Sequence, residues 1–415
     1  MRTSSRELPM FRRRLILSLL LVLSPALSPA LRCGALLRAQ QPAGDSTVTD
    51  TVAPGLVHVA YVRAQGPWRV HVVRIDLRSG DYVLRSARAF DSLRGREKTT
   101  AMAERARVAG RDVRVALNAD FFDLKSGEAV NNQVSAGRVW KALSMSGTPG
   151  GAVKSARGQF GVDRRGRPVI DRFVFAGVLS AGRQRWALDG VNAVPSNGQG
   201  LVLWLPEANG RPRADSTRPG RELRVRVVRG SWRDALMLQG RGAVTGADSM
   251  PVPGGEGVLV AYGATAPRLD SLAALSLPFA ARADWLPSVG PIDELVGGWP
   301  VILRDGISTV VESATRELTN VGNAAVRHPR SLIGFDADTS HLYLVAVDGR
   351  STASVGMTLV EVADFLRTLG VAHALNLDGG GSTTLVIDGK VVNVPSDPTG
   401  ERVVGNALLV ERRRR

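Results

Sequence analysis

The sequence predicts a mixed α/β (α+β) protein with a central mixed β-sheet, a C-terminal strand-helix-strand unit and a β-rich middle region. Three observations support this class. Short segments of alternating apolar residues, typical of β-strands, recur along most of the chain. Near the C-terminus, a helix with recognisable capping residues lies between two strand-like segments. Between about residues 150 and 290, Gly, Arg and Pro are frequent and the strand-like segments are short.

The C-terminal unit begins with a predicted β-hairpin. Residues 330–336 and 341–347 have strand-like patterns and flank the polar segment 337–340, which is typical of a turn. The two strands of a hairpin are antiparallel, so the start of the first strand faces the end of the second. We therefore expect Arg330 to lie beside Asp348.

A helix and a further strand follow the hairpin. Thr358 and Glu361 have the spacing of a capping box, in which each side chain bonds the backbone N–H of the other residue. Apolar residues then recur at helical spacing, and Gly370 stands where a left-handed C-terminal cap is expected. Residues 371–377 form a largely apolar strand. The predicted order is strand, helix, strand.

This order brings two carboxylates to one edge of the sheet. If strands 341–347 and 371–377 join one sheet through the helix, they run parallel with a right-handed crossover. Asp348 and Asp378 each follow their strand directly, so both lie at the carboxyl edge. Adjacent strands are ~4.8 Å apart, and one intervening strand doubles this spacing. Either spacing suits two carboxylates on opposite sides of a glycosidic bond, which are separated by ~5 to 9.5 Å in such enzymes.

Two cationic side chains are expected near these carboxylates. Arg330 is placed there by the hairpin, and Arg350 follows Asp348 by two residues. A neighbouring cation keeps a carboxylate ionised, and the planar guanidinium fork suits a phosphate. An ordinary ion pair that closes a loop is the structural alternative.

The segment after Asp378 is unusually rich in glycine. Gly379, Gly380 and Gly381 precede Ser382, whereas a two-residue hairpin turn requires only one or two glycines. Consecutive glycines let the backbone approach a ligand closely and direct N–H groups toward it. A tight, crowded turn is the alternative interpretation.

The N-terminal region predicts export. A basic head precedes the short apolar run 15–23, which is the pattern of a secretory signal, and an uncleaved membrane anchor remains the alternative. We predict a signal peptide over residues 1–39, a polar linker over 40–55, a strand-rich segment over 56–109 and the main domain over 110–411. The localisation is then secreted, periplasmic or associated with the cell envelope.

Composition excludes several kinds of chemistry. The single cysteine, Cys33, lies in or just after the leader, so the mature chain has neither a disulfide nor a cysteine nucleophile. The formal net charge is +16, and the seven Arg and one Glu of residues 1–39 account for part of it. Aromatic residues make up only 5% and are not interleaved with the Arg clusters, which argues against nucleic-acid binding. The basic charge favours anionic ligands such as sugar phosphates or cell-wall polymers.

Other catalytic schemes fit the sequence less well. The five histidines lack metal-binding spacing, and no Gly-x-Ser-x-Gly nucleophile elbow or phosphate-binding loop occurs. No metal site is assigned. Clusters of Asp and Asn leave a hard divalent cation such as Ca²⁺ or Mg²⁺ open as a cofactor.

Several motifs follow one another in order along the chain. The most distinctive is Asn376-Leu-Asp-Gly-Gly-Gly-Ser-Thr-Thr384. The others are Asn118-Ala-Asp-Phe-Phe-Asp123, Val296-Gly-Gly-Trp-Pro300, Arg327-His-Pro-Arg-Ser-Leu-Ile-Gly-Phe-Asp336, Val347-Asp-Gly-Arg350, Gly356-Met-Thr-Leu359, Val391-Val-Asn-Val-Pro-Ser-Asp397 and Gly405-Asn-Ala-Leu-Leu-Val410. Together they resemble the phosphodiester glycosidase family. The resemblance covers about residues 110–411 and is densest after residue 325, so that the main domain is identified as a phosphodiester glycosidase domain.

The resemblance implies hydrolysis of a sugar-1-phosphodiester, such as that of an N-acetylhexosamine, to a free sugar and a phosphomonoester. Under this hypothesis Asp378, together with Asp348, stabilises the sugar cation or activates water. Arg330 and the amides of Gly379–Gly381 hold the phosphate.

The first motif departs from the family in one respect. Asn118 and Asn376 are expected to orient sugar hydroxyls. Ala119 and Asp120 stand where the family has two glycines, which makes Asp120 a candidate for an additional polar contact.

Two other functions remain open. One is a glycosidase that acts on ordinary or uronic-acid glycosides of cell-wall or exopolysaccharides, without a phosphate. The other is a non-catalytic polysaccharide-binding protein that retains the fold. Retention of Arg330, Asp348 and Asp378 argues against the second, because a binding module does not require paired carboxylates.

Overall fold

The computed structural model describes residues 44–144, 157–195, 198–208, 220–246, 252–317 and 321–414. These residues belong to one compact unit, Pro42–Arg415. The predicted signal peptide and Cys33 lie outside the described residues. Within the described part, no helix is long and apolar enough to cross a membrane.

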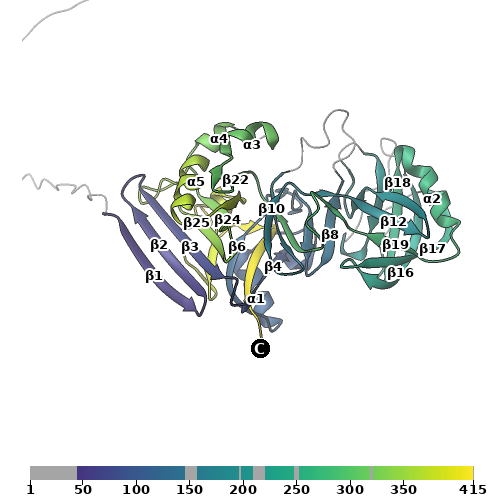
Figure 1. Ribbon diagram of the computed structural model, residues 1–415, viewed down its shortest axis with the longest axis horizontal. Helices are drawn as coiled ribbons and strands as arrows, with labels where there is room; N and C mark the ends of the chain where they lie inside the picture. Colours follow the sequence, from purple (N-terminus) through teal and green to yellow (C-terminus); the bar gives the residue numbers. More distant parts are fainter. Residues whose placement is uncertain are drawn as a thin grey trace, which may run out of the picture. The chain divides into compact units, whose positions relative to one another are not determined.

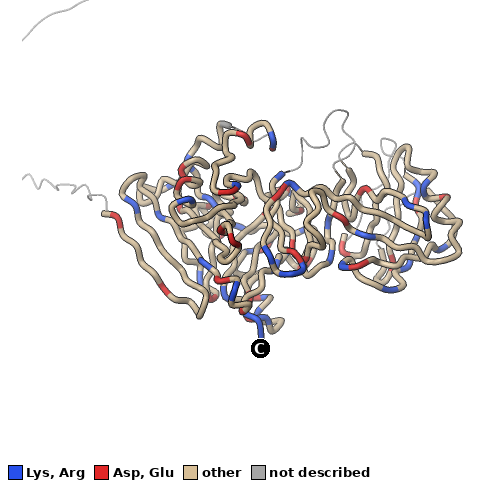
Figure 2. The backbone as a smooth tube through the Cα atoms, in the orientation of Figure 1, with Lys and Arg blue, Asp and Glu red and all other residues tan. Residues whose placement is uncertain are grey.

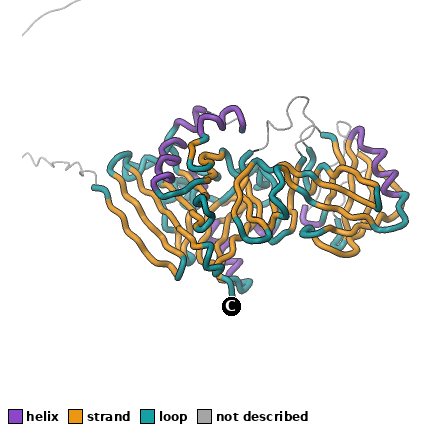
Figure 3. The backbone as a smooth tube through the Cα atoms, viewed as in Figure 1, coloured by secondary structure: helices purple, strands orange, loops and turns teal. Residues whose placement is uncertain are grey.

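The mixed, strand-rich fold class is confirmed, with several β-sheets and few helices (Figures 1 and 3). The prediction of a mixed central sheet needs correction. Eight of the described strands form this sheet and all neighbours in it are antiparallel, because the hairpin strand 330–335 stands between the two strands predicted to run parallel. Their spatial order is β1 (Ser46–Ala53), β2 (Leu56–Arg63), β3 (Trp68–Asp76), β25 (His341–Val347), β24 (Arg330–Phe335), β26 (His373–Asn376), β22 (Val301–Arg304) and β23 (Ile307–Ser308).

The predicted hairpin forms the centre of this sheet. In β24 and β25, Arg330 pairs with Val347, so the backbone of Arg330 does lie next to Asp348. Because β24 stands between β25 and β26, those two strands run parallel with one strand between them. The helix α5 (Leu359–Thr368) connects them in the chain, and its capping box between Thr358 and Glu361 is present as predicted.

A second sheet combines strands from both ends of the described chain. Five described strands lie in the spatial order β28 (Lys390–Val391), β27 (Leu385–Ile387), β6 (Asp112–Asn118), β30 (Asn406–Arg412) and β4 (Tyr82–Arg88). The N-terminal strand β6 thus pairs on one side with β27 and on the other with β30.

The two sheets pack face to face between two helices. A shared hydrophobic core takes Val73, Ile333 and Leu375 from the first sheet and Leu117 and Leu408 from the second. On the outer face of the first sheet, α5 buries its apolar side (Figure 1). On the outer face of the second sheet, α1 (Thr99–Val108) buries its own. The result is a helix–sheet–sheet–helix arrangement of layers.

The middle region is β-rich, as predicted. Thirteen described strands form a further sheet whose main core contains Leu203, Leu223, Leu259 and Phe279. Their order is β10 (Pro168–Asp171), β9 (Gln159–Asp163), β21 (Ile292–Gly297), β7 (Gln133–Ser135), β8 (Arg138–Leu143), β14 (Gly190–Val191), β15 (Gly200–Trp204), β18 (Glu256–Tyr262), β16 (Gly220–Ser231), β17 (Ala235–Gly246), β19 (Phe279–Arg282), β12 (Gly177–Ala181) and β13 (Gln184–Leu188).

Short elements complete the described chain. Two small ladders join β5 (Glu97–Lys98) to β29 (Val403–Val404) and β11 (Val174–Phe175) to β20 (Trp285–Leu286). The remaining helices are α2 (Ala266–Ala273), α3 (Val310–Arg316) and α4 (Val321–Ala325), with 3-10 turns η1 (Ala89–Asp91), η2 (Pro206–Ala208), η3 (Gly263–Thr265) and η4 (Gly380–Ser382).

Two sequence-based boundaries need correction. Residues 46–53, which we predicted as part of a linker, form the strand β1, because their alternating Thr and Val residues favour extended structure over a flexible coil. The segment 56–109 is also not separate from 110–411. Its strands pair with strands from the C-terminal part, β3 with β25 and β4 with β30.

Candidate active site

An open pocket of about 190 Å³ lies where the ends of β24 and β26 meet the loops around them. Six of the predicted site residues line it: Arg330, Arg350, Asn376, Asp378, Gly379 and Gly380. Residues that the sequence analysis had not selected complete its wall. These are Phe121, Trp299, Pro300, Asn323, Ala324, His328 and Leu359.

Asp378 is the only carboxylate among the residues that line this pocket. Its backbone N–H donates to the carbonyl of Ala119 at 2.8 Å, which fixes the residue at the end of β26. Part of the side chain remains exposed to the pocket. Burial by the surrounding protein raises the pKa of Asp378 to about 7, and the nearby negative charge of Asp120 acts in the same direction. The Ser382 hydroxyl and the charge of Arg402 oppose this rise in pKa. Asp378 can therefore gain or lose a proton near neutral pH.

One wall of the pocket is aromatic. Phe121 and Trp299 meet edge to face with their ring centroids 6.1 Å apart. The indole N–H of Trp299 donates to the carbonyl of Glu317 at 2.9 Å, and the guanidinium of Arg157 lies 4.5 Å from the Trp299 ring. These contacts hold the ring in place. A fixed aromatic surface beside a carboxylate suits the apolar face of a sugar ring.

Arg330 also lines the pocket, but its side chain does not form the ion pair that we expected with Asp348. Its guanidinium donates instead to three backbone carbonyls, those of Met357, Asn323 and Val326, at 2.9–3.1 Å. Burial lowers the pKa of Arg330 to about 10, so it remains a cation at neutral pH. The expectation failed because the side chain reaches the end of α4 and the backbone at Met357, and the hairpin alone does not fix the positions of these segments.

Arg350 and His328 also line the pocket, and His328 lies close enough to Arg330 and Arg350 to be affected by their charges. Arg350 is exposed and adopts a left-handed backbone conformation with φ 61°, which is uncommon for a residue other than glycine. Its Nη1 donates to the Ser396 hydroxyl at 3.4 Å. Burial and the charges of Arg330 and Arg350 lower the pKa of His328, so its imidazole is neutral at pH 7. The positive charge in the pocket lining therefore comes from Arg330 and Arg350.

The glycine-rich segment provides space for two guanidinium groups. A β-carbon on Gly380 would lie 2.9 Å from Nη2 of Arg350, and one on Gly381 would collide with Arg402. Gly380 also has φ 61°, which glycine adopts without strain. Its amide donates to the Pro329 carbonyl at 2.8 Å and so is not directed at a ligand as predicted. The crowded-turn interpretation is supported, and the crowding groups are cations. A ligand contact at the other glycines stays a prediction.

Gly381 and Ser382 are buried and do not line the pocket. They lie in the turn η4, which directs the chain from the pocket toward β27. Ser382 lowers the pKa of Asp378, and its buried hydroxyl has no hydrogen-bond partner among the described residues. Its effect on a ligand is therefore exerted through Asp378.

Asn118 does not line the pocket but holds the loop that carries Asp378. Its amide nitrogen donates to the carbonyl of Asp378 at 2.6 Å. Its carbonyl oxygen accepts from the Ser331 hydroxyl at 2.7 Å and from the backbone N–H of Thr384 at 3.1 Å. Since both ends of the amide bond to protein, the expected contact with a sugar hydroxyl is replaced by a supporting role for the loop 378–384.

We predict that Asn118→Ala lowers the free energy of unfolding by roughly 2–4 kcal/mol, because it leaves buried partners in three segments unsatisfied. Urea denaturation of the full chain measures this change. Ser331→Ala removes only one of the three bonds and should cost about 1 kcal/mol. Equal losses for the two variants would contradict this role of Asn118.

Asp348 is buried and does not line the pocket. One carboxylate oxygen accepts from the backbone N–H of Val394 at 2.8 Å, and the other lies 3.9 Å from Nε2 of His71. Burial raises the pKa of Asp348 to about 6. The residue thus anchors the loop after β28, which also carries Ser396, the partner of Arg350.

Asp120 is fully buried beside Asp378 and likewise does not line the pocket. Its two oxygens accept from the backbone and side-chain N–H groups of Asn131, at 3.1 and 2.7 Å. Asn376 does line the pocket. Its amide nitrogen donates to the Trp299 carbonyl at 2.6 Å, whereas its carbonyl oxygen has no partner among the described residues. Asn376 therefore has a buried acceptor that the described residues leave unsatisfied.

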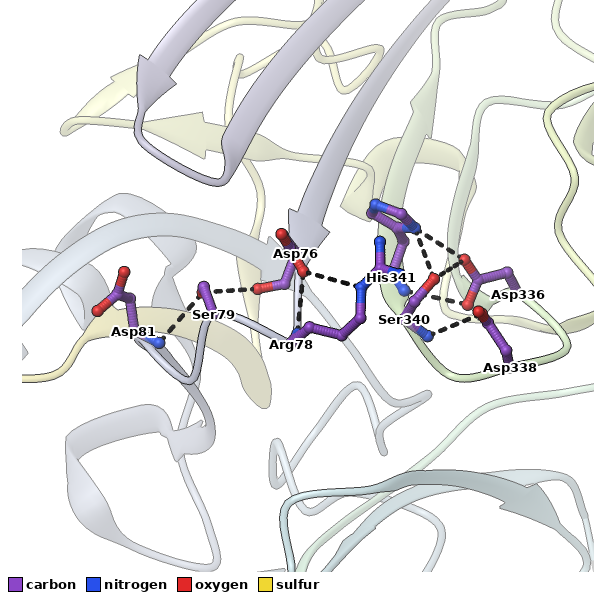
Figure 4. Close-up of polar contacts among 8 residues, drawn as sticks. All are labelled: Asp76, Arg78, Ser79, Asp81, Asp336, Asp338, Ser340 and His341. Atoms are coloured by element: carbon purple, nitrogen blue, oxygen red, sulfur yellow. Dashed lines mark hydrogen bonds and ion pairs between the residues drawn. The ribbon is translucent and has the colours of Figure 1, made fainter.

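A second polar cluster resembles a catalytic triad but lacks the required geometry (Figure 4). Nδ1 of His341 lies 2.9 Å from the Ser340 hydroxyl and 2.8 Å from Oδ2 of Asp336. In a working triad the two ring nitrogens divide these contacts, one facing the serine and the other the carboxylate. Here one nitrogen makes both. The cluster closes the turn between β24 and β25.

No group of three or more His, Cys, Asp or Glu side chains within the described residues is arranged to hold a metal ion. Basic and acidic residues are interspersed along the described chain and do not separate into blocks (Figure 2). The concentration of arginines around the pocket is therefore a local feature.

Comparison with known proteins supports a specific family. Residues 260–411 match the family model described as phosphodiester glycosidase. The mouse N-acetylglucosamine-1-phosphodiester alpha-N-acetylglucosaminidase is 34% identical over 119 residues, which represent 27% of this chain and 23% of the mouse protein. The resemblance to the phosphodiester glycosidase family is thus confirmed. The matched segment spans less than a quarter of each curated relative.

Two solved structures share the fold. A hypothetical protein from Synechocystis superposes with a TM-score of 0.68 and 22% identity, covering 89% of this chain and 64% of its own. A Burkholderia pseudomallei protein named as exported superposes with a TM-score of 0.61 and 24% identity, covering 84% and 75%. The similarity of fold therefore extends well beyond the segment matched by the phosphodiester glycosidase model.

The family match also explains which pocket residues the sequence indicated. Every lining residue except Phe121 lies within 260–411. Trp299 belongs to a recognised motif, and its position between glycines and Pro300 was a usable signal. Asn323 and Arg402 offered none, because only the folded chain brings α4 and the distant loop to this position.

Proposed function

We propose that this chain hydrolyses the glycosidic bond of a sugar-1-phosphodiester and releases a free sugar and a phosphomonoester. The observation that carries the proposal is the composition of a single pocket. A carboxylate (Asp378), two aromatic rings (Phe121 and Trp299) and two arginines (Arg330 and Arg350) all line it. A sugar joined to a phosphate requires these three kinds of surface side by side.

The aromatic residues and the arginines of the pocket suggest an orientation for the substrate. The apolar face of the sugar rests against Phe121 and Trp299, and the free carbonyl oxygen of Asn376 accepts from a sugar hydroxyl. The phosphate lies toward Arg350 and Arg330. Guanidinium groups bind phosphate oxygens through paired hydrogen bonds, which also limits rotation of the substrate. This arrangement presents the anomeric carbon to Asp378.

The chemistry then follows from what each group stabilises. The bond between the anomeric carbon and the bridging oxygen breaks, and the phosphate leaves with the electron pair. Arginine stabilises the growing negative charge on the phosphate. Ionised Asp378 stabilises the positive charge on the sugar and accepts the proton of the water whose oxygen bonds to the anomeric carbon. Because a phosphomonoester leaves readily, no strong acid is needed on the leaving side.

The name of the mouse relative suggests N-acetylglucosamine as the sugar. The basic head and apolar run of residues 1–39 suggest that the enzyme acts outside the cytoplasm, as a secreted, periplasmic or envelope-associated protein. A polymer or nucleotide that carries a sugar-1-phosphate linkage would meet it there.

A paired-substrate assay tests the proposal. Purified mature protein is incubated with methyl-phospho-N-acetylglucosamine and, separately, with the matching aryl N-acetylglucosaminide, with and without EDTA. We expect release of N-acetylglucosamine from the phosphodiester at a kcat/KM at least about a hundredfold higher, because only this substrate uses the arginines of the pocket. The EDTA samples decide whether a divalent cation takes part.

Other outcomes point to other functions. Faster cleavage of the aryl glycoside would indicate a glycosidase for unphosphorylated polysaccharides. Binding of both compounds without turnover would indicate a polysaccharide-binding protein.

A further inference from the structure

Hydrogen bonds join the backbone segments that carry Asp120 and Asp378. The charge of Asp120 also acts on Asp378. The N–H of Asp378 donates to the carbonyl of Ala119 at 2.8 Å, and Asp120 follows Ala119 at the end of β6. The side chain of Asn118 bonds the carbonyl of Asp378 at 2.6 Å. Two separate hydrogen bonds thus join the ends of β6 and β26 and bring both carboxylates to one place.

The surroundings of Asp120 exclude solvent. The residue is 1% exposed, and its carboxylate is held by Asn131 alone among the described residues. Asn131 in turn packs against Gly297, where a β-carbon would collide with it. Asp120 therefore cannot turn into the pocket to contact a substrate, and its role must be exerted from behind Asp378.

Within the described part of the chain, neither carboxylate has an ion-pair partner. Among the described residues no Lys or Arg nitrogen lies within 4.0 Å of Asp120 or Asp378. Lys141 faces Asp120 but bonds Glu128 and a carbonyl, and Arg157 faces it while lying over the Trp299 ring. On the other side, Arg402 faces Asp378 but bonds Asp397.

Two adjacent carboxylates that lack paired cations resist simultaneous ionisation. Burial raises the pKa of Asp120 to about 6, and burial together with the charge of Asp120 raises that of Asp378 to about 7. Removal of the first proton from the pair is therefore easier than removal of the second.

We propose that Asp120 and Asp378 act as one unit that holds a single proton near neutral pH, and that Asp120 sets the pH at which Asp378 becomes an ionised base. Asp120 is a positioning residue in this unit, whereas Asp378 contacts the substrate. The inference rests on the proposed function only in giving Asp378 the role of base. It also assigns a purpose to the carboxylate that this chain carries where the family it resembles has glycine.

The unit makes the proton balance of the reaction explicit. Asp378 must be ionised to accept the proton from water, and afterwards the pair holds that proton until solvent removes it. The negative charge of Asp120 strengthens the affinity of Asp378 for the proton. It also restricts the active, ionised form to higher pH than an isolated aspartate would require.

The experiment compares Asp120→Asn with the unsubstituted full chain by two measurements. One is the pH dependence of kcat/KM on methyl-phospho-N-acetylglucosamine. The other is a ¹³C NMR titration of the Asp378 carboxyl, assigned by its loss in Asp378→Asn, which requires no activity. We expect the midpoint for Asp378 to fall by about one pH unit or more in both measurements, because a neighbouring negative charge has been removed.

Glu294→Gln is the matched control. Glu294 is also a buried carboxylate whose pKa burial raises, but it bonds Arg85, Ser86 and Ala136 at a different place in the fold. Its replacement should leave the Asp378 midpoint unchanged. If Asp120→Asn does not fold, Asn131→Ala replaces it. Loss of the Asn131 donor favours neutral Asp120, so the midpoint should move in the same direction by a smaller amount.

A folded Asp120→Asn protein whose Asp378 carboxyl titrates at the original pH would overturn the proposal. Loss of activity without a shift in either midpoint would mean that Asp120 serves only to support the fold. If no sugar is released but the NMR midpoint shifts as expected, the carboxylate unit stands and the proposed reaction fails.

Discussion

Asp378→Asn is expected to reduce kcat on a sugar-1-phosphodiester by about a thousandfold or more, since it removes the only carboxylate that lines the pocket. Asparagine has nearly the same shape, so KM should change little. The measurement is release of N-acetylglucosamine under single-turnover and steady-state conditions. Full activity in a folded variant would show that another group performs the chemistry.

The same variant has a stability signature that distinguishes a catalytic loss from misfolding. The folded protein raises the pKa of Asp378 from 3.8 to about 7. Ionisation of this group therefore progressively destabilises the folded state from about pH 4 to about pH 7, and the full effect is present above that range. Asparagine avoids this effect. The melting temperature of the variant relative to the unsubstituted protein should rise between pH 4 and pH 8. A constant difference would contradict the pKa shift.

Arg350→Ala is expected to reduce kcat/KM on the phosphodiester by roughly 10- to 100-fold, the range for loss of a hydrogen bond between charged groups. The matching aryl glycoside lacks the phosphate, so its hydrolysis should not change. Because Arg350 is exposed and its bond to Ser396 is long, the melting temperature should remain within a few degrees of the original.

Two control substitutions isolate the cause of this loss. Arg350→Lys keeps the charge but loses the planar fork and should recover only part of the activity. Arg327→Ala removes an equal charge from an exposed ion pair with Glu361, away from the pocket wall, and should have little effect. Equal losses on both substrates, or equal effects at 327 and 350, would exclude a specific phosphate contact at Arg350.

Features determined by local sequence were predicted well. The hairpin β24–β25 and its register follow from alternation and turn residues, and α5 follows from its capping box and apolar spacing. Asp378 could be selected because it ends a strand immediately before three glycines. Each of these signals lies within about twenty residues of chain.

The parts that could not be predicted depend on distant segments. Arg330 was placed correctly in the sheet, but its carbonyl partners belong to segments whose positions are decided by tertiary packing. Asn118 and Asp120 were expected at the substrate, yet the pairing of β6 between two C-terminal strands buries them behind it. The aromatic wall needs Phe121 and Trp299, which are separated by nearly half the chain.

The strand order of the five-stranded sheet limits how this protein can be divided. Residues 260–411 carry the recognisable family signature, but β27 and β30 form hydrogen bonds with β6, which lies outside that segment. β25 similarly relies on β3. A fragment cut at the signature would leave β25, β27 and β30 without these hydrogen-bonding partners. It would also lose Phe121. The segment matched by the family model is therefore one part of an interleaved structure, and deletion or domain-exchange designs must retain residues 56–123 together with it.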